Sequence, residues 1–497
     1  MSGLAGEPDG TGDARLESGR EHQQFVLALD IGTTVMRGHV YDVSGHVKGA
    51  SSKKLEIEHP QQGWYEIDPH KLFQDVETGE TFHKMITWQD LRAANDVLRW
   101  NNSYTLKAMN SGAKFLHFFT RRKRHKAASG AQVHVRTGHN ASNWVLNNIP
   151  NLRQRALQDQ VMFGCIETWL LWKLTNEQVH ATDYSCASAT GIFDPFSVEW
   201  SPIVCGLVNI PMSIFPEIKD TSGNFGVTDA SIFGVPIPVT SIVADQQGAM
   251  FGQCCFEVGD VKCTMGTGTF IDLNTGSAPH ASVAGLYPLV AWKIGKEMTY
   301  MAEGQSADTG NVMEWAYTMG LFDDVADTSQ MALSVPDSGG VCFVPAFSGL
   351  QAPVNDDSAT TSIIGLTLGT SKAHMVRAIL ESLAFRFKIL YETIITETEI
   401  PLSHIRVDGG VCNNNFLMQM MADIVNQTID RSIHSDMTSL GAAFLAGLAA
   451  GVWKSKDELK AMRRTDIVFQ PQPTWPSIRD TFHLWERAVS RSLNWYR

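Results

Sequence analysis

The chain has 497 residues, of which 43% are hydrophobic, and a formal net charge of −12 at pH 7. A chain of this length is expected to hold more than one domain of roughly 100–200 residues, with enough apolar side chains for full cores. The negative charge makes the whole molecule a poor nucleic-acid binder. No apolar run reaches the roughly 18 residues that a membrane helix needs, so we expect no membrane span.

Both the N-terminus and the cysteines argue for an intracellular protein. Residues 1–22 are rich in Gly, Asp, Glu and Arg and have no apolar signal core, so we expect a disordered tail. The eight cysteines form no disulfide or zinc pattern, and Cys254 and Cys255 are adjacent, an arrangement that rarely forms a bridge. Buried reduced thiols are the simplest interpretation, which predicts a cytoplasmic location.

The N-terminal half is expected to begin with strands and continue with helices. Apolar runs predict strands over 25–30, 36–42 and about 46–57. A loop follows over 63–69, in which Asp68 can cap a helix that starts at Pro69. The spacing of apolar residues then predicts mostly helix from 91 to 160, and a helix with a strongly apolar face over 164–173.

The C-terminal half is expected to return to strands. Strands are predicted over 236–275, interrupted by a helix that opens at Asp245 and runs through Phe251. We place the domain boundary near 235–245, which divides the chain into 23–240 and 241–497. Further along the chain we expect mostly helix between 300 and 330, a strand at 340–345 and a helix at 374–394. A strand, a glycine pair and a helix should follow at 405–426, and a helix with small residues at 439–447.

Two glycine-threonine hairpins stand about 235 residues apart, at Asp30-Ile31-Gly32-Thr33-Thr34 and at Gly266-Thr267-Gly268-Thr269. Glycine lets backbone amides approach an anion, and threonine adds a hydroxyl donor. A plain hairpin turn explains either one alone equally well. Two of them, each after a strand, predict related half-domains that face one polyphosphate. The strand and glycine pair at 405–410, followed by a helix, are also typical of an anion or nucleotide site.

Together with Asp245, these motifs resemble those of the FGGY carbohydrate kinases, and within that family the glycerol kinases. The similarity runs from residue 25 to about 450 and includes LALDIGTT, GWYEIDP, VADQQGAMFGQ, MGTGTF and VDGGVCNNNFLMQMMADI. The resemblance implies an α/β fold of two actin-like ATPase (ribonuclease H-like) domains around a central cleft. It also implies transfer of the γ-phosphate of ATP, with Mg²⁺, to a hydroxyl of glycerol.

The resemblance also implies roles for residues on the substrate side of the cleft. Asp245 would be the base for the attacking hydroxyl, with a simple helix N-cap as the alternative. Gln246, Phe270 and Trp88 would line the polyol site, although Trp88 could instead be a core tryptophan. Asp30 would hold Mg²⁺, usually through water, because a carboxylate suits a hard cation that is shared with phosphates.

The residues that resemble nucleotide contacts come from both halves. Thr33 and Thr34 would touch the phosphates, and Arg37 would point at the transferred group unless it is a solvated strand residue. From the second half, Gly266 and Thr267 would face the ATP phosphates. Four positions resemble the adenosine pocket, namely Gly310, Glu314, which stands where a glutamine is common, Gly410 and Asn414.

A block of sequence is missing near residues 76–77. The helix from Pro69 has barely two turns before residues 77–80 (ETGE), a hairpin turn that needs a strand on each side. Residues 81–88 can form the second strand, but the first is absent, because 72–76 still belong to the helix. In the family, the strand expected here carries a Gln-Arg pair that binds polyol hydroxyls, so half of the substrate clamp has no counterpart in this chain.

Some properties stay open at the level of sequence. The basic run 121–126 (RRKRHK) is either a solvated loop, which is the usual case, or a patch for an anionic lipid or a partner. Three rivals to a glycerol kinase remain: a kinase for another polyol or sugar, an ATP-binding regulatory protein without phosphotransfer, and an actin- or chaperone-like ATPase. The GWYEIDP and AILESLAFR stretches argue against the last of these. Homo-oligomerisation is also undecided.

Overall fold

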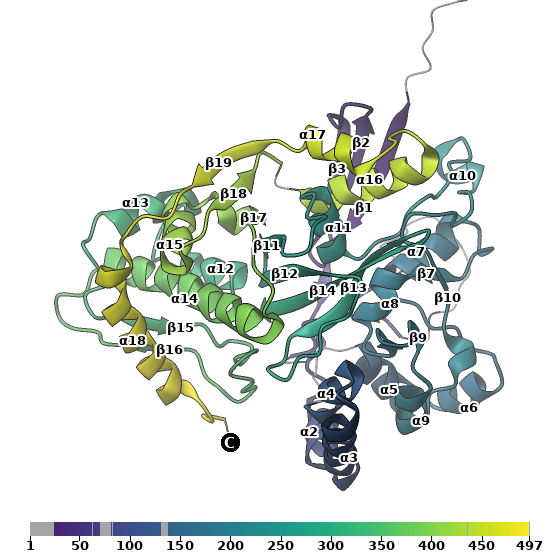
Figure 1. Cartoon of the computed structure of the whole chain (residues 1–497), viewed down its shortest axis with the longest axis horizontal. Coiled ribbons are helices and arrows are strands. Elements are labelled where there is room, and N and C mark those ends of the chain that lie inside the picture. The colour runs from purple at the N-terminus through teal and green to yellow at the C-terminus, as the bar shows by residue number, and fades with distance from the viewer. Residues whose placement is uncertain are drawn as a thin grey trace, which may run out of the picture.

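The structure is a computed structural model that describes residues 24–61, 63–69, 81, 83–130, 138–434 and 436–496, with backbone only for 138–140. The expected tail at 1–22 and the expected turn at 77–80 lie outside the described residues. Of the helix expected to start at Pro69, only Pro69 itself is described. The described chain is a mixed α/β structure in which two groups of strands and helices lie side by side (Figure 1).

The N-terminal half begins with an antiparallel sheet of order β1-β2-β3. Strand β1 (Phe25–Ile31) pairs with β2 (Val35–Asp42), and Ile31 lies opposite Met36, so residues 32–34 form the connecting turn. The other side of β2 pairs with β3 (Val47–Lys54). The expected first hairpin is therefore confirmed, and β1 is an edge strand among the described residues.

A second small sheet follows, formed by β4 (Ile57–Glu58), β5 (Glu66–Ile67) and β6 (Met85–Ile86). The loop expected at 63–69 thus contains a short strand, and only two residues of the strand expected at 81–88 are paired. Arg92 organises this region, because its buried guanidinium lies 2.8 Å from the carboxylates of both Glu66 and Asp90. A buried charge with two partners fixes a local structure that strand propensity does not encode.

The segment 91–160 is helical, as expected, and forms α2 (Ala94–Asn102), α3 (Tyr104–Thr120), α4 (Lys123–Ser129), α5 (Gly138–Asn148) and α6 (Leu152–Leu157). The loop interpretation of the basic run 121–126 is wrong. The chain turns at Arg121, which has a left-handed backbone with φ of 55°, and the run then enters α4. Helices α2, α3 and α4 form a group that projects from the body of the molecule (Figure 1).

The remainder of the N-terminal half is α7 (Ile166–Leu174), β7 (Ala181–Asp183), α8 (Tyr184–Ala189), β8 (Phe193–Asp194), β9 (Glu199–Trp200), α9 (Pro202–Val208), β10 (Glu217–Lys219) and α10 (Ala230–Phe233). The apolar helix expected at 164–173 is confirmed as α7. The strand expected from 236 is absent among the described residues. Only isolated bridges form there, from Pro238 to Val227 and from Ser241 to Ser222.

A seven-stranded sheet of order β13-β14-β12-β11-β17-β18-β19 forms the centre of the C-terminal half. Its strands are β11 (Val261–Met265), β12 (Thr269–Gly276), β13 (Tyr287–Ile294), β14 (Glu297–Ser306), β17 (Ile405–Asp408), β18 (Ile429–Ser432) and β19 (Thr465–Phe469). The second hairpin and the strand before the glycine pair are as expected. Residues 300–306, expected in a mostly helical region, instead complete β14.

Helices cover this sheet, and two further strands form a small ribbon beside it. The helices are α11 (Asp245–Gly252), α12 (Gly310–Thr318), α13 (Thr328–Leu333), α14 (Lys372–Thr398), α15 (Asn415–Val425), α16 (Met437–Ala450), α17 (Lys456–Met462) and α18 (Trp475–Ser492), and the ribbon is β15 (Cys342–Val344) with β16 (Ser362–Ile364). The close packing expected of the small residues in α16 is confirmed, because a Cβ on Gly441 would lie 1.8 Å from the carbonyl oxygen of Gly248 in α11. Helix α16 also packs on β1 and joins the two halves.

Each half contains a similar hairpin, but the first strand of the two hairpins has different pairing partners. Strand β11 pairs antiparallel with β12 on one side and parallel with β17 on the other. Strand β1 pairs antiparallel with β2, but the side that corresponds to β17 carries no strand among the described residues. A strand from the block that the sequence predicts to be missing would therefore pair at this edge of β1.

Candidate active site

Asp245 is the first residue of α11 and lies exposed on the surface. The N-cap residue of this helix is Ala244, so the alternative that Asp245 is a simple N-cap is wrong. Its carboxylate accepts a hydrogen bond from the backbone N–H of Gln246 at 2.8 Å, which fixes its direction. The helix dipole favours an anion at this position, and an exposed, oriented carboxylate can accept a proton from a hydroxyl placed against it.

A buried lysine supports Gln246, and sequence reasoning missed it. The Nζ of Lys262 donates to the side-chain oxygen of Gln246 and, at 2.6 Å, to Asp272. Burial raises the pKa of Asp272, and burial together with Asp272 raises the pKa of Glu303 well above its usual range. Burial lowers the pKa of Lys262, but the nearby carboxylates Asp272, Asp408 and Glu303 outweigh burial and raise it. Lys262 therefore stays charged and holds Gln246 beside Asp245.

Asp30 lies at the end of β1 and is only 8% exposed. The Nη1 of Arg37 lies 3.3 Å from its carboxylate, so Arg37 forms an ion pair. The pKa of Asp30 is raised to about 7, first by burial and then by the charges of Asp436 and Asp245, while Arg37 opposes the rise. Three acidic side chains, from β1, the start of α11 and the N-cap of α16, thus converge between the two halves.

A magnesium ion fits this acidic cluster better as a partly hydrated ion than as one with an all-protein shell. Among the described residues, no three His, Cys, Asp or Glu side chains are arranged to hold a metal. Mg²⁺ usually keeps several waters and uses one or two carboxylates together with substrate phosphates. Asp30 suits this role, because burial and then the charges of Asp436 and Asp245 raise its pKa, and a nearby cation would offset both effects. The assignment of Mg²⁺ to Asp30 stays a prediction.

The raised pKa of Asp30 predicts a pH dependence of stability. Because its folded pKa of about 7 exceeds its ordinary value of 3.8, the folded protein binds this proton more tightly than the unfolded chain does. The free energy of unfolding should therefore fall as the pH rises from about 4 to about 7. Asp30→Asn should remove this part of the slope. Thermal unfolding of both proteins across this range measures it, and identical slopes would contradict the raised pKa.

Two aromatic rings, one from each half of the chain, meet beside the first hairpin. The Nε1 of Trp88 donates to the hydroxyl of Thr33 at 3.1 Å. The rings of Trp88 and Phe270 meet edge to face with centroids 6.0 Å apart. Both rings are half-buried, so Trp88 is not a fully enclosed core residue. Their accessible faces can pack against a short carbon chain. Thr34, on the same turn, is exposed.

The second hairpin lies against the start of α12. The N–H of Gly310 donates to the carbonyls of Gly266 at 3.0 Å and Thr267 at 2.9 Å. A Cβ on Gly310 would lie 2.5 Å from the carbonyl oxygen of Gly266, so only glycine fits there. The side chain of Thr267 remains exposed. Gly266, Thr267 and Gly310 are thus brought together as expected, and their roles stay predictions.

The two glycines at 409 and 410 have different surroundings, a difference that the sequence did not predict. Gly409 has φ of 94°, and a Cβ there would lie 2.5 Å from the carbonyl oxygen of Met265. A Cβ on Gly410 would meet no atom within 4 Å. Gly409 is therefore the glycine that packs closely against the end of β11. Gly410 faces open space, where a ligand could lie.

Of the two remaining adenosine-pocket candidates, Asn414 already has a structural role and Glu314 does not. Asn414 is the N-cap of α15: its side chain accepts from the N–H of Leu417 at 2.9 Å and donates to Thr328 at 3.0 Å. Glu314 lies exposed on α12. A contact between Asn414 and a nucleotide would need the remaining lone pairs of its side chain or a change of partner.

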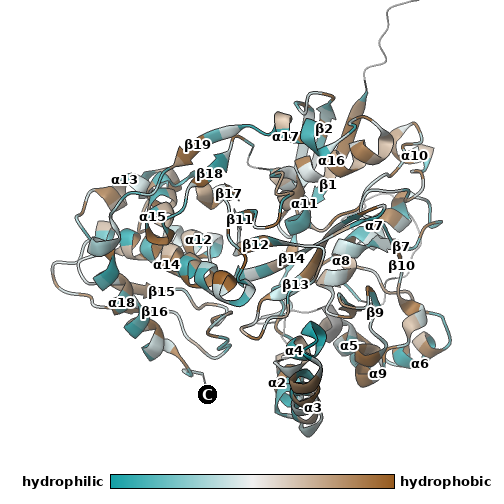
Figure 2. Cartoon of the chain, viewed as in Figure 1, coloured by the Kyte–Doolittle hydropathy of each residue, from teal (hydrophilic) through white to brown (hydrophobic). Residues whose placement is uncertain are grey.

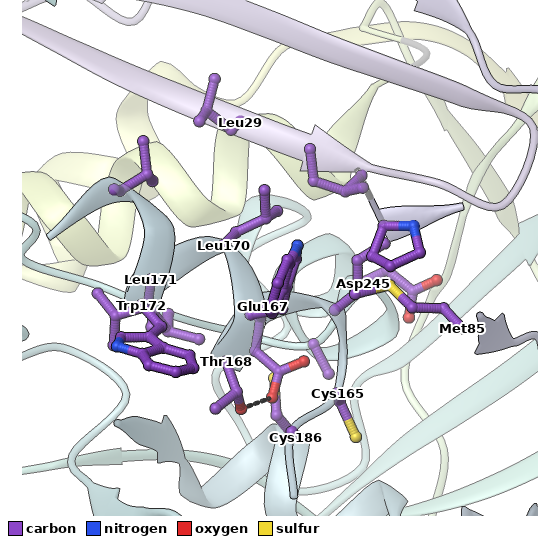
Figure 3. Close-up of a pocket in the computed structure, with 18 of the residues that line it drawn as sticks. Leu29, Met85, Cys165, Glu167, Thr168, Leu170, Leu171, Trp172, Cys186 and Asp245 are labelled. Atoms are coloured by element: carbon purple, nitrogen blue, oxygen red, sulfur yellow. Dashed lines mark hydrogen bonds between the residues drawn. The ribbon is translucent and has the colours of Figure 1, made fainter. Parts of the chain in front are cut away.

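A cavity of about 1100 Å³ opens beside the unpaired edge of β1. Figure 3 shows Leu29 of β1 and Leu170 of α7 on its walls and Asp245 beside it. Thr168 donates to Glu167 at 3.0 Å deeper in the cavity. Thr33, Trp88 and Asp245 also line this space, so among the described residues the substrate side of the site is continuous with the cavity beside β1.

Family comparisons cover both halves of the chain. The N-terminal domain of the FGGY family of carbohydrate kinases matches residues 25–81 and 75–252, and its C-terminal domain matches residues 261–450. The chain belongs to the FGGY family of carbohydrate kinases. The N-terminal match of this FGGY kinase comes in two pieces that overlap at residues 75–81, next to the position where a block is expected to be missing.

Relatives named as glycerol kinases extend the comparison. Glycerol kinase 5 of Danio rerio is 49% identical and covers 96% of this FGGY kinase and 98% of the relative. Glycerol kinase 5 of Homo sapiens is 46% identical, with 100% and 99% covered. The Danio rerio comparison spans 519 positions, whereas 96% of 497 residues is about 477, so about 40 positions of the comparison have no residue in this chain.

Solved structures confirm the expected fold of two actin-like domains. The crystal structure of Plasmodium falciparum glycerol kinase with ADP has a TM-score of 0.82 and 29% identity, and covers 95% of this FGGY kinase and 98% of that chain. Gluconate kinase from Lactobacillus acidophilus has a TM-score of 0.76 at 22% identity, with 94% and 98% covered, and supports the fold alone.

Proposed function

We propose that this FGGY kinase transfers the γ-phosphate of ATP to a hydroxyl of glycerol. The observation that carries the proposal is the 44–51% identity to proteins named glycerol kinase 5 from six vertebrates. Bacterial proteins named glycerol kinase are 35–36% identical over 95% of the chain. The chemistry of the candidate site supports the same reaction.

The substrate side of the site supplies a base and positioning groups. Phosphoryl transfer depends on positioning, charge neutralisation and a base for the nucleophile. We propose that Asp245 accepts the proton of the attacking glycerol hydroxyl. The hydroxyl oxygen bonds to the γ-phosphorus, while the bond between this phosphorus and the oxygen that leaves with ADP breaks. Gln246, held by Lys262, would bind another polyol hydroxyl. Trp88 and Phe270 would pack on the carbon chain.

The phosphate side of the site supplies hydroxyls, amides and charge. Thr33 and Thr34 from the first turn and Thr267 from the second would contact phosphate oxygens. Bound Mg²⁺ would neutralise phosphate charge, and Asp30 would hold it directly or through water. Arg37, beside Asp30, would act on the transferred group. The adenosine would lie near Gly310, Glu314, Gly410 and Asn414.

We also propose a cytoplasmic location, because all eight cysteines are free. Among the described residues, no helix combines the length and apolar character that a bilayer crossing requires.

The test of the function is ADP release by the purified chain with glycerol and with a panel of other polyols and sugars. Turnover that rises with glycerol above the background without acceptor supports the proposal. Turnover only with another acceptor would reassign the substrate. Nucleotide binding without turnover on any acceptor would favour an ATP-binding regulatory protein.

Two substitutions on the nucleotide side should weaken nucleotide binding without unfolding the protein. Thr267→Val removes an exposed hydroxyl, and Gly410→Val fills open space beside the glycine pair. A hydrogen bond to a charged group contributes about 1.5–3 kcal/mol, so Thr267→Val should bind Mg·ADP roughly 10- to 100-fold more weakly. Gly410→Val should also weaken binding, because its side chain would occupy the space proposed for the ligand. Isothermal titration measures the affinity. Gly409→Val is the contrasting variant, and it should lower the melting temperature because its Cβ would clash with Met265. Unchanged titrations in both folded variants would remove these residues from the nucleotide site.

A further inference from the structure

Helix α3 carries an exposed aromatic face. Four of its aromatic side chains are 64–93% exposed, namely Tyr104, Phe115, Phe118 and Phe119. Their spacing of i, i+11, i+14 and i+15 places them on one stripe of a helix with 3.6 residues per turn. The opposite face buries Leu106 and Ala113 against the neighbouring helices. The aromatic face of α3 is therefore directed away from the protein.

The rings of this aromatic face form one contiguous patch. The centroids of Phe115 and Phe119 are 4.8 Å apart, and those of Phe118 and Phe119 are 5.2 Å apart. The guanidinium of Arg121 lies 5.6 Å from the centre of the Phe118 ring, so the patch continues directly into the basic run. Exposed apolar patches with a polar rim mark interaction sites.

The surroundings of the aromatic face are strongly cationic. The chain carries a net charge of −12, yet it has no Asp or Glu between Asp96 and Asp159. Seven basic residues lie between positions 104 and 130, namely Lys107, Lys114, Arg121, Arg122, Lys123, Arg124 and Lys126. In the part of the chain that the structure describes, only Arg124 among these seven pairs with a carboxylate, that of Asp194 at 2.6 Å.

The position of α3 leaves its aromatic face accessible to a large flat partner. Helices α2, α3 and α4 project from the body and lie far from α11, which carries Asp245 (Figure 1). Figure 2 shows apolar colour on α3 next to polar colour on α4. Contact at this end of the molecule would therefore leave the candidate active site open.

We propose that α3 and α4 bind the surface of an anionic membrane. The aromatic face would enter the boundary between headgroups and acyl chains, and the basic run would contact acidic headgroups. A second copy of the chain fits less well, because two such surfaces carry the same positive charge. A nucleic acid would satisfy the basic residues, but it would leave Met109 and Leu116, which are also exposed on α3, without an apolar partner.

The test is sedimentation of the full chain with vesicles of phosphatidylcholine alone and with about one-third phosphatidylserine. The chain should bind only the anionic vesicles, and added salt should weaken binding. The double variants Phe118→Ser/Phe119→Ser and Arg122→Glu/Lys123→Glu should each reduce vesicle partitioning more than about tenfold. Matched controls are Leu333→Ser and Arg487→Glu, which change exposed residues elsewhere and should bind as wild type does.

Circular dichroism and melting temperature establish that each variant is folded. Each of the following three results would overturn the proposal. Binding of folded aromatic variants at the wild-type level, or equal binding to neutral vesicles, would exclude an anionic membrane as the partner. Binding to an oligonucleotide but not to vesicles would assign the surface to nucleic acid. A dimer in light scattering that the Phe118→Ser/Phe119→Ser variant disrupts, without vesicle binding, would assign the aromatic face to a second copy.

Discussion

Replacing Asp245 with asparagine should abolish phosphotransfer while leaving the affinity for ATP within a few fold of wild type. Asparagine has nearly the same size, and its side-chain oxygen can still accept from the N–H of Gln246, so the start of α11 should persist. It cannot take the proton of the attacking hydroxyl. Loss of a positioned base typically slows a reaction by 10²–10⁴-fold, about 3–5 kcal/mol of barrier.

Glycerol-dependent ADP release and Mg·ADP titration of the same preparation measure the two effects separately. Asp229→Asn is a matched control, because Asp229 is a partly exposed aspartate that caps the short helix α10 and lies outside the candidate site. This control should change neither quantity. Equal losses of nucleotide binding and turnover in Asp245→Asn would instead mean that Asp245 supports the structure.

Much of the candidate site could be predicted because its signals are local in the sequence. The turn after β1, the turn after β11 and the opening of α11 each depend on a few adjacent residues, and short-range turn and capping chemistry encodes them. Lys262 depends on a contact with Gln246, 16 residues away, which only the folded sheet creates. The sequence signal that could have pointed to Lys262 is a single lysine between two apolar residues of a predicted strand.

The errors arose where tertiary packing decides between local alternatives. Strand β14 reads EMTYMAEGQS, which contains several good helix formers, yet its centre is buried between two neighbouring strands. The pair Gly409 and Gly410 is a second case, because either glycine could adopt positive φ in isolation. In the folded protein Gly409 has the positive φ, and a Cβ there would clash with the carbonyl of Met265. Asp436 was missed because its charge matters only where α16 meets Asp30.

The open edge of β1 connects the fold to the expected activity. Where water does not reach, each unpaired backbone group of an interior strand costs roughly 1–3 kcal/mol. Leu29 on this strand is 40% exposed, whereas four of the five residues of β11, which has strands on both sides, are buried. Against a typical stability of about 5–15 kcal/mol, several such losses weaken the N-terminal half substantially. The same edge borders the cavity that opens onto Asp245 and Trp88.

Restoring a block of about 40 residues next to positions 76–77 should therefore raise both the melting temperature and glycerol-dependent turnover substantially. A strand paired with β1 would satisfy its open edge and fill part of the cavity. The arginine that the family resemblance implies on that strand would give the polyol hydroxyls a charged partner, so the nucleophile would be better positioned. Nucleotide affinity should change less, because Thr267, Gly410 and Asn414 all lie in the C-terminal half.

Both forms should be compared by ADP release with glycerol, thermal unfolding and amide hydrogen exchange. An insertion of equal length made of glycine and serine is the control, and it should restore neither stability nor turnover. Amides of β1 should exchange rapidly in the present form and slowly after the block is restored, because exchange follows local opening. Similar turnover, melting and exchange in the two forms would contradict the expectation. That result would mean that residues already present, at Pro69 or around β6, close the edge of β1 and hold the polyol.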